Sequence, residues 1–164
     1  PILLLVYFLG IRRYSLKGLG FSLNYWYIAL ILIVLIGGAS YGLFPEGLQF
    51  QSQAETGNLI LNMLLLGFLT AAIPEEITRY LLQTRLAKVL NNKALAWFIA
   101  SLIWAAIHIP SFSQGDTNLY GASIGALGIL PIGLFWGYLN ERYQSIIPTV
   151  IIHGTNLWGL QNIF

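Results

Sequence analysis

Long apolar stretches alternate with short polar loops along most of the chain. Five stretches of largely apolar residues occupy positions 21–43, 58–74, 93–109, 118–139 and 145–163. A helix that crosses a bilayer needs about 20 such residues. The opening residues 1–10 are also apolar, but they are too few to span. The pattern therefore predicts an all-α protein, a multi-spanning transmembrane helical bundle with five full spans and one partial span.

The composition supports this interpretation. Hydrophobic residues make up 57% of the 164 residues and charged residues only 9%, whereas ordinary soluble domains carry about 25% charged residues. A soluble chain could not cover its surface with so few charges. We therefore expect one membrane domain over residues 1–164, trimmed at its N-terminus because the chain begins with Pro1. The lack of cysteine excludes disulfides and thiolate metal sites.

The charged residues lie in the loops and indicate an orientation. Loops on one side of the predicted spans carry the basic residues Arg12, Arg13, Lys17, Arg85, Lys88, Lys93 and Arg142, and the opposite loops carry none. Basic loops face the cytoplasm in membrane proteins. We expect a multi-pass protein of a bacterial cytoplasmic membrane, with the lipid bilayer as a partner. The net charge of +2 is too small to indicate a nucleic-acid partner.

A second kind of helix is predicted after the second span. Residues 79–92 place Leu81, Leu82, Leu86, Val89 and Leu90 against Arg85 and Lys88. Apolar residues that recur at helical spacing opposite basic ones are typical of an amphipathic helix in the membrane interface.

Ionisable residues interrupt three of the apolar stretches. They are Glu75, Glu76, Arg79, His108 and His153, with the amide Asn156 nearby. Each ionisable side chain costs a few kcal/mol at the bilayer centre. Counted at about 1.5 Å per residue, the two histidines and Glu75 lie about 15 to 22 Å along their helices from the nearest basic loop residue. Three spans therefore bring polar groups to a similar depth, as a buried site requires.

Less specific explanations exist for each group alone. A single histidine in an apolar helix is often a hydrogen-bonded core residue. Glu76 and Arg79, at i and i+3, can form an ion pair on one helix face. Pro74 followed by two acids is also a favourable helix start. The gathering of all these groups at one depth favours a functional site.

These residue types suit peptide hydrolysis without a covalent intermediate. An ionised carboxylate beside a histidine can act as a general base for water, and a second histidine and an amide can stabilise an oxyanion. The chain has no cysteine and lacks the HExxH motif. Two alternatives stay open: a zinc-dependent membrane metalloprotease that uses both histidines and a glutamate, and a non-catalytic scaffold, immunity or transport protein with a buried polar network.

Three short motifs resemble those of the CPBP intramembrane proteases, which include type II CAAX prenyl endopeptidases and bacterial Abi proteins. "EEITR", "WAAIH" and "HGTN" occur in the family's order, on separate predicted helices, and the resemblance covers about residues 58–160. The family pattern places an arginine one residue later, where this chain has Tyr80. It also places an asparagine one residue later, where this chain has Leu157.

The resemblance implies a role for each matching residue. Glu75 would be the general base, with His108 assisting, and His153 and Asn156 would stabilise the oxyanion. The supporting residues would be Glu76, Arg79 and Trp104, which shape the site. The family is understood to need no cofactor or metal. It cleaves peptides or membrane proteins, in some members prenylated ones.

Overall fold

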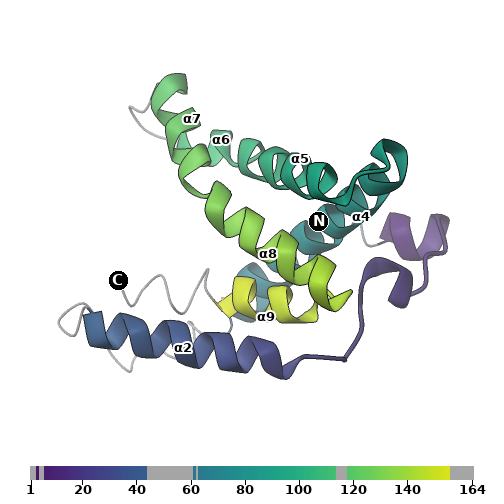
Figure 1. The fold of residues 1–164 in the computed structure, drawn as a ribbon, viewed down its shortest axis with the longest axis horizontal. Coiled ribbons are helices and arrows are strands. Elements are labelled where there is room, and N and C mark those ends of the chain that lie inside the picture. Colours follow the sequence, from purple (N-terminus) through teal and green to yellow (C-terminus); the bar gives the residue numbers. More distant parts are fainter. Residues whose placement is uncertain (1–2, 4–5, 44–60, 62, 114–117, 156–164) are drawn as a thin grey trace. The chain divides into compact units, whose positions relative to one another are not determined.

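The computed structural model describes residues 3, 6–43, 61, 63–113 and 118–155 (Figure 1). Every regular element within these ranges is a helix, and they contain no strand. The all-α class predicted from the sequence is therefore confirmed for the described residues. The helices are η1 (Tyr7–Ile11), η2 (Lys17–Leu19), α2 (Tyr27–Leu43), η4 (Met63–Ala72), α4 (Ile73–Leu90), α5 (Lys93–Ala106), α6 (Ile109–Phe112), α7 (Leu119–Gly128), α8 (Leu130–Tyr143) and α9 (Ile147–Thr155).

Among the described residues, two helical runs are long and apolar enough to cross a membrane. They cover Lys93–Phe112 and Leu119–Tyr143, with mean hydropathies of 1.7 and 1.6, and they coincide with the predicted spans 93–109 and 118–139. Only 28% and 22% of their most apolar windows are buried, whereas a core helix of a soluble protein would be mostly buried. The predicted spans 58–74 and 145–163 lie partly outside the described residues.

Most of the segment predicted as an interfacial amphipathic helix, residues 79–92, is helical and belongs to a longer helix. Residues 79–90 form the C-terminal part of α4, which begins at Ile73 and has no break at Arg79. The reason is local, because no glycine or proline follows Pro74 until after Leu90. Pro74 itself lies where the wider π-helix η4 gives way to α4. Such changes of winding are common where proline cannot donate a main-chain hydrogen bond.

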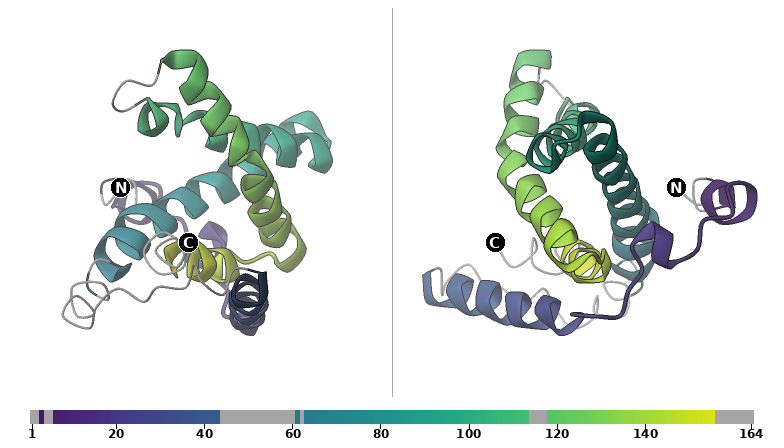
Figure 2. Two further views of the ribbon diagram at one scale, coloured as in Figure 1. Left: turned by 90° about the vertical axis from the view of Figure 1, so that its left-hand side faces the viewer. Right: turned by 45° about the vertical axis from the view of Figure 1, so that its right-hand side comes forward.

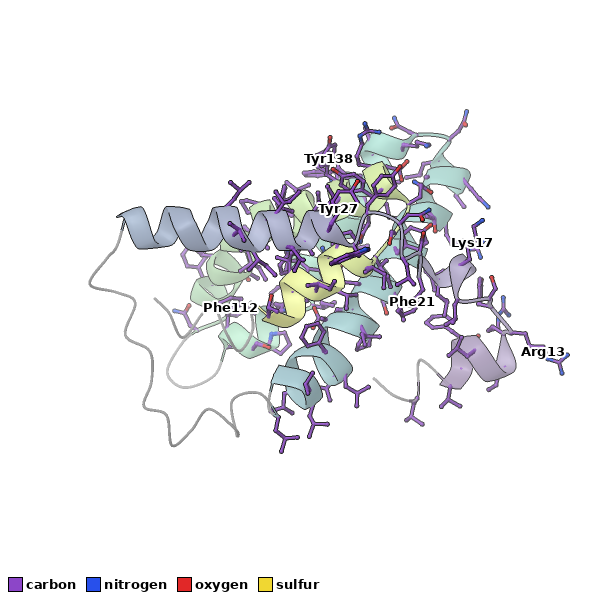
Figure 3. The ribbon with its side chains drawn as sticks, turned by 90° about the horizontal axis from the view of Figure 1, so that it is seen from below. Arg13, Lys17, Phe21, Tyr27, Phe112 and Tyr138 are labelled. Atoms are coloured by element: carbon purple, nitrogen blue, oxygen red, sulfur yellow. The ribbon has the colours of Figure 1, made fainter. Side chains whose placement is uncertain are left out.

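The chain divides into two compact units. The first comprises Pro1–Ile77 with Tyr143–Phe164, and the second comprises Thr78–Arg142. Within the first unit α9 packs against η4 and α2 (Figure 2). The N-terminal segment also holds the turn before α9, because the Ile146 amide donates to the Gly20 carbonyl at 2.9 Å and the Ser145 hydroxyl to the Ser22 carbonyl at 2.7 Å. Arg13 and Lys17 point outward from this segment (Figure 3).

A polar seam along α8 joins three helices of the second unit. Side chains of α4 and α5 donate hydrogen bonds to carbonyls of α8: Arg79 and Ser101 to Gly133, Trp97 to Leu134, and Gln83 to Gly137. Gly133 and Gly137 allow this close approach. A Cβ atom at these two glycines would lie only 2.6 Å from Trp104 Cε3 and 2.8 Å from Trp97 Cδ1, respectively.

Candidate active site

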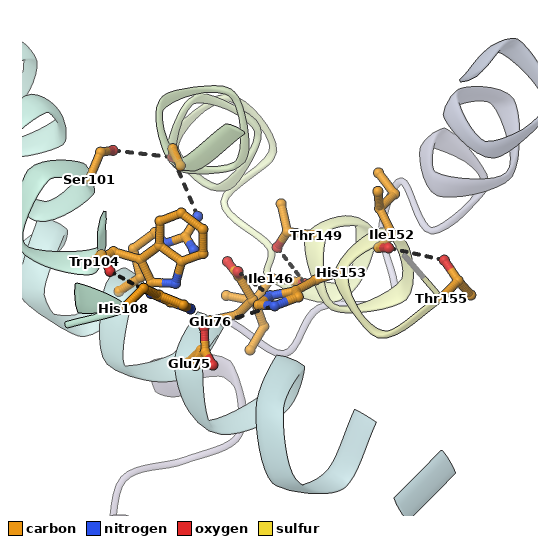
Figure 4. Close-up of polar contacts among 12 residues, drawn as sticks. Glu75, Glu76, Ser101, Trp104, His108, Ile146, Thr149, Ile152, His153 and Thr155 are labelled. Carbon is orange, nitrogen blue, oxygen red and sulfur yellow. Dashed lines mark hydrogen bonds and ion pairs between the residues drawn. The ribbon is translucent and has the colours of Figure 1, made fainter. Parts of the chain in front are cut away.

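The first unit contains a buried carboxylate–histidine cluster. Glu75 and Glu76 lie in the first turn of α4, and His153 lies near the end of α9. His153 Nδ1 is 3.0 Å from Glu76 Oε1, and His153 Nε2 is 3.9 Å from Glu75 Oε2 (Figure 4). The structure thus brings together groups from two of the predicted polar spans. Residues 77 positions apart in the sequence form one cluster.

The two glutamates of this cluster differ in their access to solvent. The Glu76 side chain is fully buried, whereas the Glu75 side chain is 25% exposed. A buried carboxylate needs hydrogen-bond donors, and the His153 ring supplies one. Because a carboxylate only accepts, an ionised Glu76 fixes the His153 proton on Nδ1 and holds the ring in one orientation. Glu75 is therefore the carboxylate that water can reach.

The backbone of α9 is shaped to accommodate His153. Pro148 is the second residue of the helix, a position where a missing amide hydrogen costs nothing. Gly154 lies directly after the histidine, and a Cβ there would be 2.6 Å from Phe68 Cδ1 of η4. The glycine lets α9 and η4 pack closely beside His153.

The second unit holds the other histidine by a different arrangement. His108 Nδ1 lies 2.8 Å from the carbonyl oxygen of Trp104 (Figure 4). The centroids of the imidazole and indole rings are 4.6 Å apart. Helix α5 ends at Ala106, and the His108 amide bonds to the Ala105 carbonyl instead. The Trp104 carbonyl, one of the last four of the helix, is satisfied by the His108 ring. A carbonyl only accepts, so Nδ1 carries the proton and Nε2 is the acceptor of the neutral ring.

This contact gives a physical reason for the spacing in "WAAIH". Residues four apart on a helix lie on the same face. At the end of α5 that spacing brings the histidine ring to both the carbonyl and the aromatic face of Trp104. The four-residue spacing therefore places the His108 ring and also favours hydrogen on its Nδ1.

Arg79 lies in the polar seam beside the same tryptophan. Its guanidinium carbon is 4.2 Å from the ring centroid of Trp104 and 5.3 Å from that of Trp136. Arg79 Nη1 donates to the Gly133 carbonyl at 3.4 Å. Arg79 is only 2% exposed, so the cation is almost completely removed from solvent. Tyr80, where the family pattern has arginine, is half-buried, and burial together with the nearby Glu141 carboxylate raises the pKa of its phenol.

The predicted site residues therefore fall into two groups. Glu75, Glu76 and His153 form one cluster, and Arg79, Trp104 and His108 belong to the other. The predicted pairing of Glu76 with Arg79 joins residues of different units and stays a prediction, and Asn156 lies outside the described residues.

Sequence reasoning missed three residues that shape these groups: Phe68, Gly133 and Trp136. A signal for the last two was present in "GLFWG", whose glycines stand four apart as in close-packed membrane helices. Phe68 had no such signal.

A metal centre was the alternative use of the histidines. In the part of the chain that the structure describes, no group of three or more histidine, cysteine, aspartate or glutamate side chains is arranged to hold a metal ion. Nδ1 of His153 and Nδ1 of His108 each have a hydrogen-bond partner within the protein. A zinc site built on these residues would have to use the other nitrogen of each ring.

The family assignment follows from comparison with known proteins. The family model described as type II CAAX prenyl endopeptidase Rce1-like matches residues 57–158. The chain belongs to this family. Rce1-like proteins are integral membrane peptide hydrolases of the CAAX type, so the resemblance to the CPBP proteases is confirmed. No curated protein and no solved structure matches the chain. The matched range contains both histidine groups and Asn156.

Proposed function

We propose that the chain is an intramembrane endopeptidase in which Glu75 activates a water molecule for attack on a peptide bond. The observation that carries this proposal is the difference in solvent exposure between two adjacent carboxylates that both lie near His153. Glu76 is fully buried against His153 Nδ1, while Glu75 is 25% exposed and 3.9 Å from His153 Nε2. One carboxylate orients the histidine, and the other faces the reacting water.

The proposed reaction uses these groups in two proton transfers. Glu75 takes a proton from water, and the resulting hydroxide bonds to the scissile carbonyl carbon. His153, when its ring carries both protons, donates from Nε2 to the developing oxyanion, together with the Asn156 amide. When the tetrahedral intermediate collapses, the carbon–nitrogen bond breaks and Glu75 returns its proton to the leaving amine. The assisting role of His108 rests on the family motif, with Nε2 as the acceptor.

The membrane setting is part of the same proposal. We infer a single multi-spanning domain over residues 1–164, with a catalytic core at about residues 58–160 and the basic loops on the cytoplasmic side. The substrates would be peptides or membrane proteins, including prenylated ones. No cofactor would be required.

The substitution Glu75→Gln tests the central assignment. It keeps the size and hydrogen-bonding capacity of the side chain but removes the base, so cleavage should fall by at least about 10²-fold. The assay uses purified protein in detergent with two quenched fluorescent peptides, one prenylated and one not. Glu141→Gln is the matched control and should leave turnover unchanged, because Glu141 pairs with Lys93 at a solvent-accessible position. Undiminished turnover in Glu75→Gln would refute the proposed role of Glu75 as the base.

Two further measurements separate the alternatives. Bound zinc in a 1:1 ratio, with activity lost to a chelator and restored by zinc, would establish the metalloprotease mechanism in place of the one proposed. A wild-type protein that cleaves neither peptide, yet keeps its cellular activity in the Glu75→Gln and His108→Ala variants, would support a non-catalytic scaffold, immunity or transport protein.

A further inference from the structure

Four side chains form a continuous stack in the second unit. Arg79 lies over the ring of Trp104 at 4.2 Å and near that of Trp136 at 5.3 Å, and the two tryptophan rings meet edge to face at 5.5 Å. Trp104 also contacts the ring of His108, with the ring centroids 4.6 Å apart. Trp104 and Trp136 are only 6% and 5% exposed, so the stack is desolvated.

The stack fixes the orientation of Trp104 from three directions. A cation over an indole face is stabilising, and more strongly so when water is excluded. The edge-to-face pairing with Trp136 stabilises this position of the ring further. The third neighbour is Gly133, where a Cβ atom would lie 2.6 Å from Trp104 Cε3, so the indole occupies the space that a larger residue would need. Trp104 cannot turn without disturbing Arg79 or Trp136.

The orientation of Trp104 in turn determines that of His108. The histidine ring has two contacts with the same residue, a hydrogen bond to its carbonyl and a ring contact at an interplanar angle of 56°. A displaced indole would remove the second contact and leave the imidazole to rotate about the first. The ring could then exchange its Nδ1 proton for one on Nε2.

We propose that Arg79 and Trp136 are positioning residues that act on His108 through Trp104, a role that rests on the proposed function for its effect on catalysis. Together they hold the His108 ring in the tautomer with hydrogen on Nδ1 and with Nε2 as a proton acceptor. Neither residue needs to touch the substrate.

This role also accounts for the early position of the arginine in "EEITR". Successive residues of a helix are about 100° apart around its axis. At position 79 the side chain enters the seam and reaches both tryptophans, whereas position 80 carries a half-buried tyrosine beside Glu141. In this chain the arginine is thus placed to contact the tryptophans that support His108.

The test combines steady-state kinetics with NMR of the histidine rings. The chain has only two histidines, so ¹⁵N-histidine labelling gives two sets of ring signals, which a His153→Gln variant assigns. The variants are Arg79→Gln, Arg79→Lys and Trp136→Leu. Trp97→Leu is the matched control, because Trp97 lies in the same seam and bonds to the Leu134 carbonyl without being part of the stack.

The expected result separates positioning from general destabilisation. Arg79→Gln and Trp136→Leu should lower kcat by about 10-fold with KM changed less than about twofold, and His108 should show both tautomers. Arg79→Lys keeps a cation over the indole and should recover at least half of the lost kcat. Trp97→Leu should lower the melting temperature by a similar amount while the His108 signals stay those of one tautomer.

Three results would overturn the inference. One is an unchanged His108 tautomer in both Arg79→Gln and Trp136→Leu, and another is the same tautomer change in Trp97→Leu. The third is a wild-type His108 with hydrogen on Nε2. The NMR result is independent of turnover, so a wild-type protein that cleaves no peptide would refute the proposed function while the positioning of His108 could still be judged. If the leucine variant does not fold, Trp136→Phe provides the same comparison with a smaller effect.

Discussion

The two histidines of this protein are both held at Nδ1, but by partners of different kinds. His153 faces a carboxylate, Glu76 Oε1, at 3.0 Å, whereas His108 faces a main-chain carbonyl at 2.8 Å. A carboxylate can gain or lose a proton, so the state of His153 is linked to that of its neighbour. A carbonyl only accepts, so the partner of His108 favours hydrogen on Nδ1 and has no proton of its own to exchange. The first arrangement suits a residue that responds to developing charge, and the second suits a fixed proton acceptor.

A glycine makes room for a side chain near each histidine. The aromatic rings that lie against the two glycines differ in how tightly they are packed. Gly154 makes room for Phe68, whose side chain is half-buried. Gly133 makes room for Trp104, which is 6% exposed and confined by Arg79 and Trp136. A methyl group added at the two positions should therefore have unequal consequences, although the close contact is 2.6 Å in both cases.

The largest effect is expected from Glu76→Gln, which removes the charge at His153 and preserves the shape. The amide can still bond to Nδ1, but it can do so as donor or acceptor, so the ring loses its fixed proton. We expect kcat/KM to fall by about 10²-fold. The tautomer of His153 should change, and that of His108 should stay the same. Ring ¹⁵N shifts and peptide cleavage report the two effects. An unaltered His153 spectrum would refute the role of Glu76.

The next effect is expected from Gly133→Ala. The added carbon would meet a tryptophan that cannot move, and overpacking of this kind costs about 1–3 kcal/mol. The melting temperature should fall, and His108 should lose its single tautomer. Gly137→Ala is the matched control, because its added carbon would meet Trp97 at 2.8 Å, outside the stack. Equal loss of the His108 signature in both variants would contradict the distinction drawn between these glycines.

A smaller effect is expected from Gly154→Ala. The Phe68 ring can shift, so kcat should fall only about threefold, at the lower end of overpacking costs. The double variant Gly154→Ala with Phe68→Leu should recover most of the activity, since it removes the ring that the methyl group meets. Double-variant kinetics that simply add the two single losses would show that the two side chains do not interact.

The smallest effect is expected from Gly128→Ala at the end of α7. A Cβ there would have no atom within 4 Å, so nothing must shift. Alanine is favoured over glycine in a helix by about 0.5 kcal/mol, so the melting temperature should rise slightly while turnover is unchanged. A loss of activity in this variant would mean that the glycine effects elsewhere reflect backbone flexibility, and not the space around Trp104 and Phe68.

Local patterns in the sequence were enough to predict the class of the protein and part of its candidate site. The all-helical fold and the spans near residues 93–109 and 118–139 follow from apolar length alone, because the bilayer admits few other solutions. The contact of Trp104 with His108 also follows from spacing, since both residues belong to one helical turn. The family could be predicted for the same reason, because each of its motifs is a short local pattern.

The partners across helices were decided only by the tertiary structure. The contact of His153 in α9 with Glu76 joins residues 77 positions apart, and no spacing along one helix could predict it. Periodicity predicted an amphipathic helix at residues 79–92, and the structure shows that residues 79–90 continue the helix that begins at Ile73. Local spacing determines which side chains share a face. Only the packing of distant segments, which local periodicity does not encode, determines what that face meets.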